Sequence, residues 1–99
     1  MKQIDDCFNR FFAGKNQRKA KWQVHQPNEG DYIVLFHYNH MALMIDPDNL
    51  EIAYEWPGEC PTDVRGIKAA IKYLEENKSR LLEQIAKEKI GAQKKLKVD

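Results

Sequence analysis

Several features that assign a chain to a specialised class are scarce or missing in these 99 residues. Two cysteines, Cys7 and Cys60, are too few for a disulfide scaffold and lack the spacing of a metal site. No apolar run approaches the roughly 20 residues that a membrane-spanning helix needs. Asp5 and Asp6 stand where the apolar region of a signal peptide would begin. We therefore expect a cytoplasmic protein with free thiols and no membrane partner.

The sequence motifs of common enzymes are missing as well. There is no glycine-rich phosphate loop, no nucleophile elbow and no paired Cys-x-x-Cys. His37 and His40 are three positions apart on a turn, but a zinc site needs a third ligand, and none stands at a diagnostic spacing. Cys60 precedes a helix start, where the pKa of a thiol tends to fall, yet no activating base stands at a recognisable spacing. We expect no catalytic residue, no metal and no cofactor, and a metal- or thiol-dependent enzyme is the third alternative.

Basic residues are almost missing from the middle of the chain, although the overall charge is +1. Residues 31–65 carry seven acidic side chains and a single basic one, Arg65. Residues 1–30 carry six basic and three acidic side chains, and residues 66–99 carry nine basic and five acidic ones. An acidic middle between basic ends bears more directly on partners than the near-neutral total does.

Hydrophobic periodicity predicts six elements. Apolar residues recur every three or four positions near both ends of the chain, which indicates amphipathic helices, and turn residues divide the middle into short strands. The expected elements are a helix over 3–13, strands over 20–26, 32–38, 41–46 and 50–56, and a helix from 62 to at least 77. The apolar seam of the last helix continues to residue 86, and we expect a frayed tail over 92–99.

The two central strands are apolar on both faces, whereas a half-buried strand alternates apolar and polar residues. The element order predicts one α+β domain over residues 1–99: a four-stranded antiparallel meander flanked by a short N-terminal helix and a long C-terminal helix. Two arrangements are open. Either the helices leave one apolar face uncovered, which a second copy or a partner must cover, or they divide between the two faces.

A protein-binding site is expected at the turn between the central strands and on the fourth strand. The turn is polar and lies beside an apolar surface, and the fourth strand carries a row of carboxylates that suits a basic groove. The plainer interpretation is that His37 packs in the sheet, that His40 hydrogen-bonds its turn, and that the carboxylates form a solvated face. The candidate residues are His37, Tyr38, Asn39, His40, Glu51 and Glu55.

Nucleic acid is the alternative partner. A basic loop precedes an aromatic residue, and basic residues repeat every seven positions along the last helix, as phosphate neutralisation with a stacking ring would use them. Four glutamates dilute that helix, and a pI of 7.8 is low for a dedicated nucleic-acid binder. The candidate residues are Lys15, Arg18, Lys19, Lys21, Trp22, Arg80, Lys87 and Lys94.

Three segments, FHYNH, DPDN and CPTDVRGIKAAIKYL, together resemble small accessory proteins of phages and plasmids, over about residues 20–76. The resemblance implies a protein without catalysis that occupies the surface of a host protein, as anti-restriction and anti-CRISPR inhibitors do. The near-neutral charge departs from the strongly acidic DNA mimics of that kind. We therefore expect a non-enzymatic macromolecule-binding protein: a mobile-element inhibitor or adaptor that blocks a host protein such as a defence nuclease, and that forms a homodimer.

Overall fold

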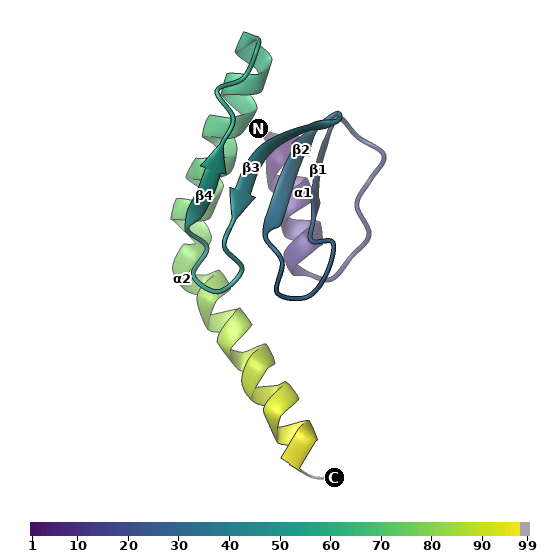
Figure 1. Cartoon of the computed structure of the whole chain (residues 1–99), viewed down its shortest axis with the longest axis vertical. Helices are drawn as coiled ribbons and strands as arrows, with labels where there is room; N and C mark the ends of the chain where they lie inside the picture. The colour runs from purple at the N-terminus through teal and green to yellow at the C-terminus, as the bar shows by residue number, and fades with distance from the viewer. Residues whose placement is uncertain (98–99) are drawn as a thin grey trace.

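The computed structural model describes the backbone of residues 1–97 and the side chains of residues 1–89. The expected α+β fold is confirmed: along the chain, a short first helix precedes one antiparallel sheet in the order β1-β2-β3-β4, and a long last helix follows it (Figure 1). The elements are α1 (Lys2–Phe12), β1 (Trp22–His25), β2 (Ile33–His37), β3 (His40–Ile45), β4 (Ile52–Glu55) and α2 (Pro61–Lys97).

Helix α1 follows from an apolar stripe and from the glycine after its last turn. Its buried residues recur at helical spacing and are Ile4, Cys7 and Phe8. Gly14 adopts a left-handed conformation with φ of 71°. Its N–H donates to the carbonyl of Phe11, and the N–H of Lys15 donates to the carbonyl of Arg10. These two bonds form a Schellman motif, so the helix ends where the sequence predicts.

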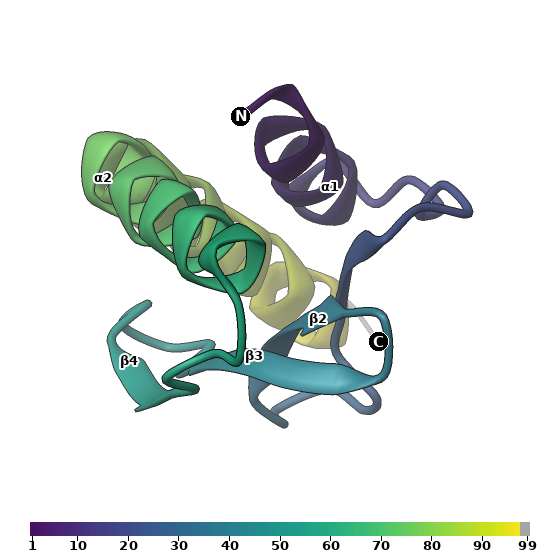
Figure 2. The same cartoon turned by 90° about the horizontal axis from the view of Figure 1, so that it is seen from above.

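Both helices pack on the same face of the sheet (Figure 2). Helix α1 contacts β1 and α2, and α2 contacts β3. The core between the layers consists mainly of Ile4, Phe8, Trp22, Val24, Ile33, Leu35, Leu43, Ile45, Ile67, Ala70, Leu74 and Leu81. Within residues 1–97, no helix covers the other face. The helices therefore do not divide between the two faces, and one face of the sheet has no helix over it in residues 1–97.

A β-bulge decides which residues of the central hairpin point away from the helices. Phe36 lies opposite Met41, and Val34 lies opposite Met44. The two β2 residues are two positions apart but their β3 partners are three apart, so Ala42 is the extra residue. Because side chains alternate along a strand, this insertion places both methionines on the face away from the helices.

Helix α2 is continuous for 37 residues and passes Asn77 without a break. A helix of this length extends for about 55 Å at 1.5 Å per residue. Figure 1 shows its C-terminal part continuing beyond the end of the sheet. The sequence predicts a frayed tail over 92–99; the described helix extends to Lys97. Residues 98 and 99 lie outside the described residues.

The second half of α2 still contacts the body of the protein. Leu81 is fully buried in the core. Gln84 Nε2 donates to the carbonyl of Phe12 over 2.8 Å, and Lys89 Nζ lies 3.0 Å from Asp48 Oδ1 in the β3–β4 turn. These contacts hold α2 against the N-terminal helix and the end of the sheet as far as residue 89.

Candidate functional site

The face of the sheet away from the helices carries large apolar side chains; we call it the open face. It comprises Tyr32, Val34, Phe36, Met41, Met44 and Tyr54. Met41 is 49% exposed, Tyr32 is 45% exposed and Tyr54 is 43% exposed. Phe36 and Met44 are half-buried, and Val34 is buried beneath its neighbours. Contiguous apolar side chains of this size on the surface of a small protein mark an interaction site.

The open face is hollowed at one end of the sheet, where the β1–β2 and β3–β4 turns lie. The hollow has a volume of about 540 Å³, within the range of roughly 300–1,000 Å³ usual for ligand sites. Its floor is apolar and consists of Tyr32, Val34, Met41 and Met44. Its rim belongs to the two turns and consists of Pro27, Gly30, Asp31, Asp46, Pro47 and Asp48.

Local hydrogen bonds fix the two turns that form the rim. Asp46 Oδ1 accepts the N–H of Asp48 over 2.8 Å, and the Asp46 carbonyl accepts the N–H of Leu50 over 2.8 Å. In the other turn, the N–H of Asp31 donates to the carbonyl of Asn28. The first of these bonds forms an Asx turn and the other two are backbone turns, as is typical of segments rich in Asp, Asn and Pro. The rim is therefore held in place without a ligand.

The rim is acidic. Three carboxylates line it, and among the described residues no lysine, arginine or histidine does. Asp48 is paired with Lys89. Asp31 accepts one hydrogen bond from Asn28 Nδ2 at 3.1 Å, and neither Asp31 nor Asp46 forms an ion pair with any described residue. The hollow therefore combines an apolar floor with two carboxylates that have free oxygen atoms.

The turn between β2 and β3 is only partly available to a partner. Tyr38, Asn39 and His40 are exposed, and Tyr38 rather than Asn39 takes the left-handed conformation, with φ of 55°. His37 is 5% exposed and stacks on Trp22 with ring centres 4.0 Å apart. The sequence predicts that His37 contacts a partner; the structure corrects this, because the side chain points into the core.

His37 instead joins the sheet to the start of α2. Its Nδ1 lies 2.5 Å from Asp63 Oδ1, and since a carboxylate only accepts, the imidazole donates this bond. Asp63 Oδ2 accepts the backbone N–H groups of Glu59 and Cys60, as an acidic residue in the first helical turn does in a capping box. One buried carboxylate thus caps α2 and holds β2 against it.

The pKa of Asp63 lies below its ordinary value, chiefly because the Glu59 N–H donates to the carboxylate, with further bonds from Cys60 and His37; together they outweigh the effect of burial. A depressed pKa stabilises the folded state above the pKa of the unfolded chain, near pH 4 for aspartate. We expect the difference in melting temperature between the wild type and Asp63→Asn to be full at pH 7 and to shrink as the pH falls below about 4. Thermal unfolding followed by circular dichroism at pH 7, 5 and 3 measures it; a constant difference contradicts the assignment.

Neither cysteine has the surroundings of a nucleophile. Cys60 is exposed, but its Sγ lies 3.2 Å from Asp63 Oδ2, so the thiol faces a carboxylate instead of the His37 imidazole. Because the pKa of Asp63 is depressed, chiefly by the Glu59 N–H, this carboxylate is too weak a base to take the thiol proton. Burial raises the pKa of the Cys7 thiol to about 12, which keeps it protonated at neutral pH.

The two glutamates of the fourth strand do not form the expected acidic row. Met44 lies opposite Tyr54 and Ile45 opposite Ile52, so Ala53 is an extra residue that breaks the alternation. Glu55 consequently lies opposite a residue that faces the helices, Leu43, and Glu51 pairs with Lys78 of α2. Both carboxylates are exposed, but they lie toward the helices and apart from the open face.

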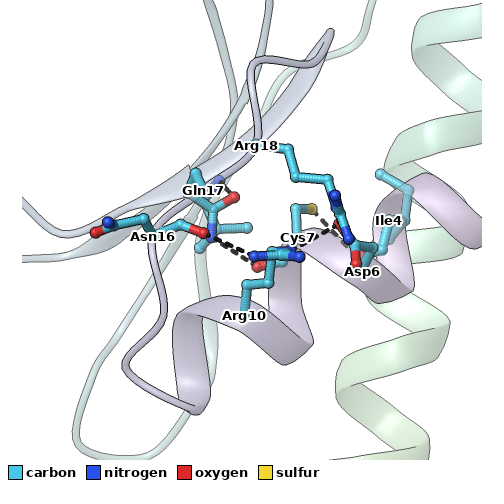
Figure 3. Close-up of polar contacts among 8 residues, drawn as sticks. Ile4, Asp6, Cys7, Arg10, Asn16, Gln17 and Arg18 are labelled. Carbon is cyan, nitrogen blue, oxygen red and sulfur yellow. Dashed lines mark hydrogen bonds and ion pairs between the residues drawn. The ribbon is translucent and has the colours of Figure 1, made fainter.

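The basic loop before β1 is tied to helix α1 (Figure 3). Arg18 Nε lies 3.1 Å from Asp6 Oδ2, and Gln17 Nε2 donates to the carbonyl of Cys7. Gln17 Oε1 also accepts the N–H of Val24, which occupies part of the free edge of β1. Lys15, Lys19 and Lys21 are exposed. The loop therefore has a structural role, because it covers part of the free edge of β1.

The nucleic-acid alternative loses its stacking aromatic. Trp22 is 2% exposed and its ring lies against His37, so no base can stack on it in this conformation. On α2, Arg80 donates to Asn77 and Lys87 pairs with Glu83. Lys94 lies outside the residues whose side chains are described. The exposed ring that lies beside the basic loop is instead Tyr38, whose N–H donates to the carbonyl of Lys21 over 2.8 Å.

The sequence does not locate the hollow, although one signal for it is present. The two-sided apolar hairpin predicts an uncovered face, but the hollow depends on the bulge at Ala42 and on two turns that are far apart along the chain. Asp31 and Asp46 are the residues of this site that sequence reasoning overlooks. Aspartate is common in turns for structural reasons, so the sequence gives no sign that these two residues line a binding site.

Among the described residues, no group of three or more histidine, cysteine, aspartate or glutamate side chains is arranged to hold a metal ion. Neither helix, over its described residues, has a stretch that is long and apolar enough to cross a bilayer. Comparison with protein-family models, with curated proteins and with solved structures gives no significant match.

Proposed function

We propose that this protein is a non-enzymatic binding protein that takes a protein partner on the open face of its sheet. The observation that carries the proposal is the placement of both helices on one side, which leaves Met41, Tyr32 and Tyr54 exposed on the other. Tyrosine and methionine are enriched in protein interfaces because they offer large contact areas, and methionine adapts its shape to different partners.

The energetic reason is the apolar surface that the fold leaves in water. Fully burying a methionine side chain is worth roughly 1.5–3 kcal/mol. Two methionines and three exposed or half-buried aromatic rings lie together on the open face, so a partner that covers them gains several such contributions at one site. The exposed part of the β2–β3 turn adjoins this face and supplies polar groups for its edge.

Three finer expectations remain predictions under this proposal. They are an inhibitor or adaptor of phage or plasmid origin that blocks a host protein, a second copy of the chain as the occupant, and a cytoplasmic location. An uncovered apolar face is compatible with each. For nucleic acid we find weaker support, because Trp22 is buried and the acidic rim would repel phosphate. The exposed ring beside the basic loop is that of Tyr38, whose N–H donates to the carbonyl of Lys21.

The substitution Met41→Glu tests the proposal. It places a charge on the exposed centre of the open face, so we expect binding of the partner to fall at least tenfold, since a buried charge without a counter-ion is strongly unfavourable. Immobilised wild type and variant are exposed to an extract of the source organism, and bound proteins are quantified by mass spectrometry. Light scattering in parallel shows whether the occupant is a second copy, as a mass of twice 11.6 kDa that Met41→Glu halves.

Val64→Glu is the matched control, because Val64 is also an exposed apolar residue but lies on α2, away from the open face. Circular dichroism should show that both variants are folded. If Met41→Glu binds the partner as strongly as Val64→Glu does, the open face is not the binding site.

A further inference from the structure

We infer that the hollow in the open face binds a cationic segment of a partner protein, in which an apolar side chain stands next to a lysine or arginine. The inference rests on the proposed function and names the chemistry of the partner at that same face. It follows from the combination of an apolar floor with an acidic rim, which the rest of the open face does not have.

The floor accounts for the apolar side chain. Tyr32, Val34, Met41 and Met44 line a space of about 540 Å³ that is open to solvent on one side. Both methionines have three rotatable side-chain bonds and adjust to the shape of an inserted group. The hollow is continuous with the exposed rings of the open face, so a chain segment lying across the sheet reaches it.

The rim accounts for the positive charge. Asp31 and Asp46 each have an oxygen atom that no described residue occupies with a cation, and they lie on opposite turns at the two sides of the hollow. The third carboxylate, Asp48, already binds the ammonium group of Lys89. The protein's own lysine thus shows the kind of contact that the two remaining carboxylates offer to a partner.

The same charges argue against other occupants. A second copy that packed its hollow on this one would bring the same acidic rims together, and like charges across an interface oppose association. A phosphate backbone would be repelled in the same way. A cationic apolar segment is the one occupant that both gains from the floor and neutralises the rim.

Selection from a phage-displayed library of random twelve-residue peptides on the immobilised wild type tests the inference. We expect a consensus in which Lys or Arg flanks Leu, Ile, Phe or Trp. The synthetic consensus peptide, measured by fluorescence anisotropy, should bind Asp31→Asn/Asp46→Asn about tenfold more weakly than the wild type and should weaken with added salt. Asparagine retains the oxygen that accepts the local hydrogen bond in each turn, so the rim keeps its shape.

The control variant is Glu75→Gln/Glu76→Gln, which removes two exposed carboxylates from α2 and should leave the affinity unchanged. An uncharged or acidic consensus whose binding Met41→Glu abolishes, or a library that yields no binder, would overturn the cationic partner and leave the open face as the proposed site. A consensus peptide that binds Met41→Glu as tightly as the wild type would count against both.

Discussion

Gly66→Ala should destabilise the protein strongly, although alanine in a helix interior normally improves on glycine by about 1 kcal/mol. Gly66 lies in α2 directly over the Trp22 ring. An added Cβ would lie 2.8 Å from Trp22 Cε2 and closer still to Cζ2 and Cη2. The ring has no room to retreat, because it is buried and stacked on His37. We expect a net loss of about 3 kcal/mol, which lowers the melting temperature of a domain of this size by roughly 12–24 °C.

A double-mutant cycle with Trp22→Phe separates this clash from any general effect on the helix. Phenylalanine lacks the part of the indole that the new Cβ would overlap, so the cost of Gly66→Ala should be clearly smaller in that background. Chemical unfolding of the four proteins gives the coupling. Gly66→Ala with unchanged or raised stability would mean that α2 does not lie this close to β1.

Asp63→Ala should have the second large effect, because it removes one acceptor that serves four donors. The backbone N–H groups of Glu59 and Cys60, the Cys60 thiol and the His37 imidazole all donate to this carboxylate. His37 Nε2 already has no hydrogen-bond partner among the described residues. Without Asp63 the buried imidazole would have none on either nitrogen, and α2 would lose its cap.

The measurement is thermal unfolding at pH 7, where we expect the melting temperature of Asp63→Ala to fall by roughly 10 °C or more. Asp63→Asn keeps the shape and part of the hydrogen bonding, so its loss should be smaller than that of the alanine variant. Thr62→Ala, a neutral substitution at the exposed neighbouring position, should change little. Equal losses in Asp63→Ala and Thr62→Ala would exclude the proposed role of the carboxylate.

Local patterns predict the elements well, because each strand and helix here is delimited by turn chemistry or by apolar periodicity. Gly14 ends α1 and the Asp46-Pro47-Asp48 turn separates β3 from β4 as the residue types indicate. The bulges at Ala42 and Ala53 are different, because alanine has no preference that marks an inserted residue. The face to which β4 presents its glutamates could therefore not be read from alternation.

Contacts between residues far apart along the chain could not be predicted from the sequence, for a different reason. Trp22 stands among lysines and glutamines, a setting that favours stacking on a base, but the fold places His37 and Gly66 against its ring. His37 and Asp63 are 26 positions apart, and only the packing of α2 on the sheet brings them into contact. A single sequence carries no signal for such a pair.

The two-layer arrangement lets neighbouring residues of one strand serve different purposes. In β2, Ile33 and Leu35 belong to the core, while Val34 and Phe36 face outward. The outward set contributes little to the packing of the helices, so it is free to change through mutation while the scaffold stays intact. Substitutions on the outward face can therefore change which partner is bound at a small cost in folding stability. The same property makes this face a suitable starting surface for engineering new specificities.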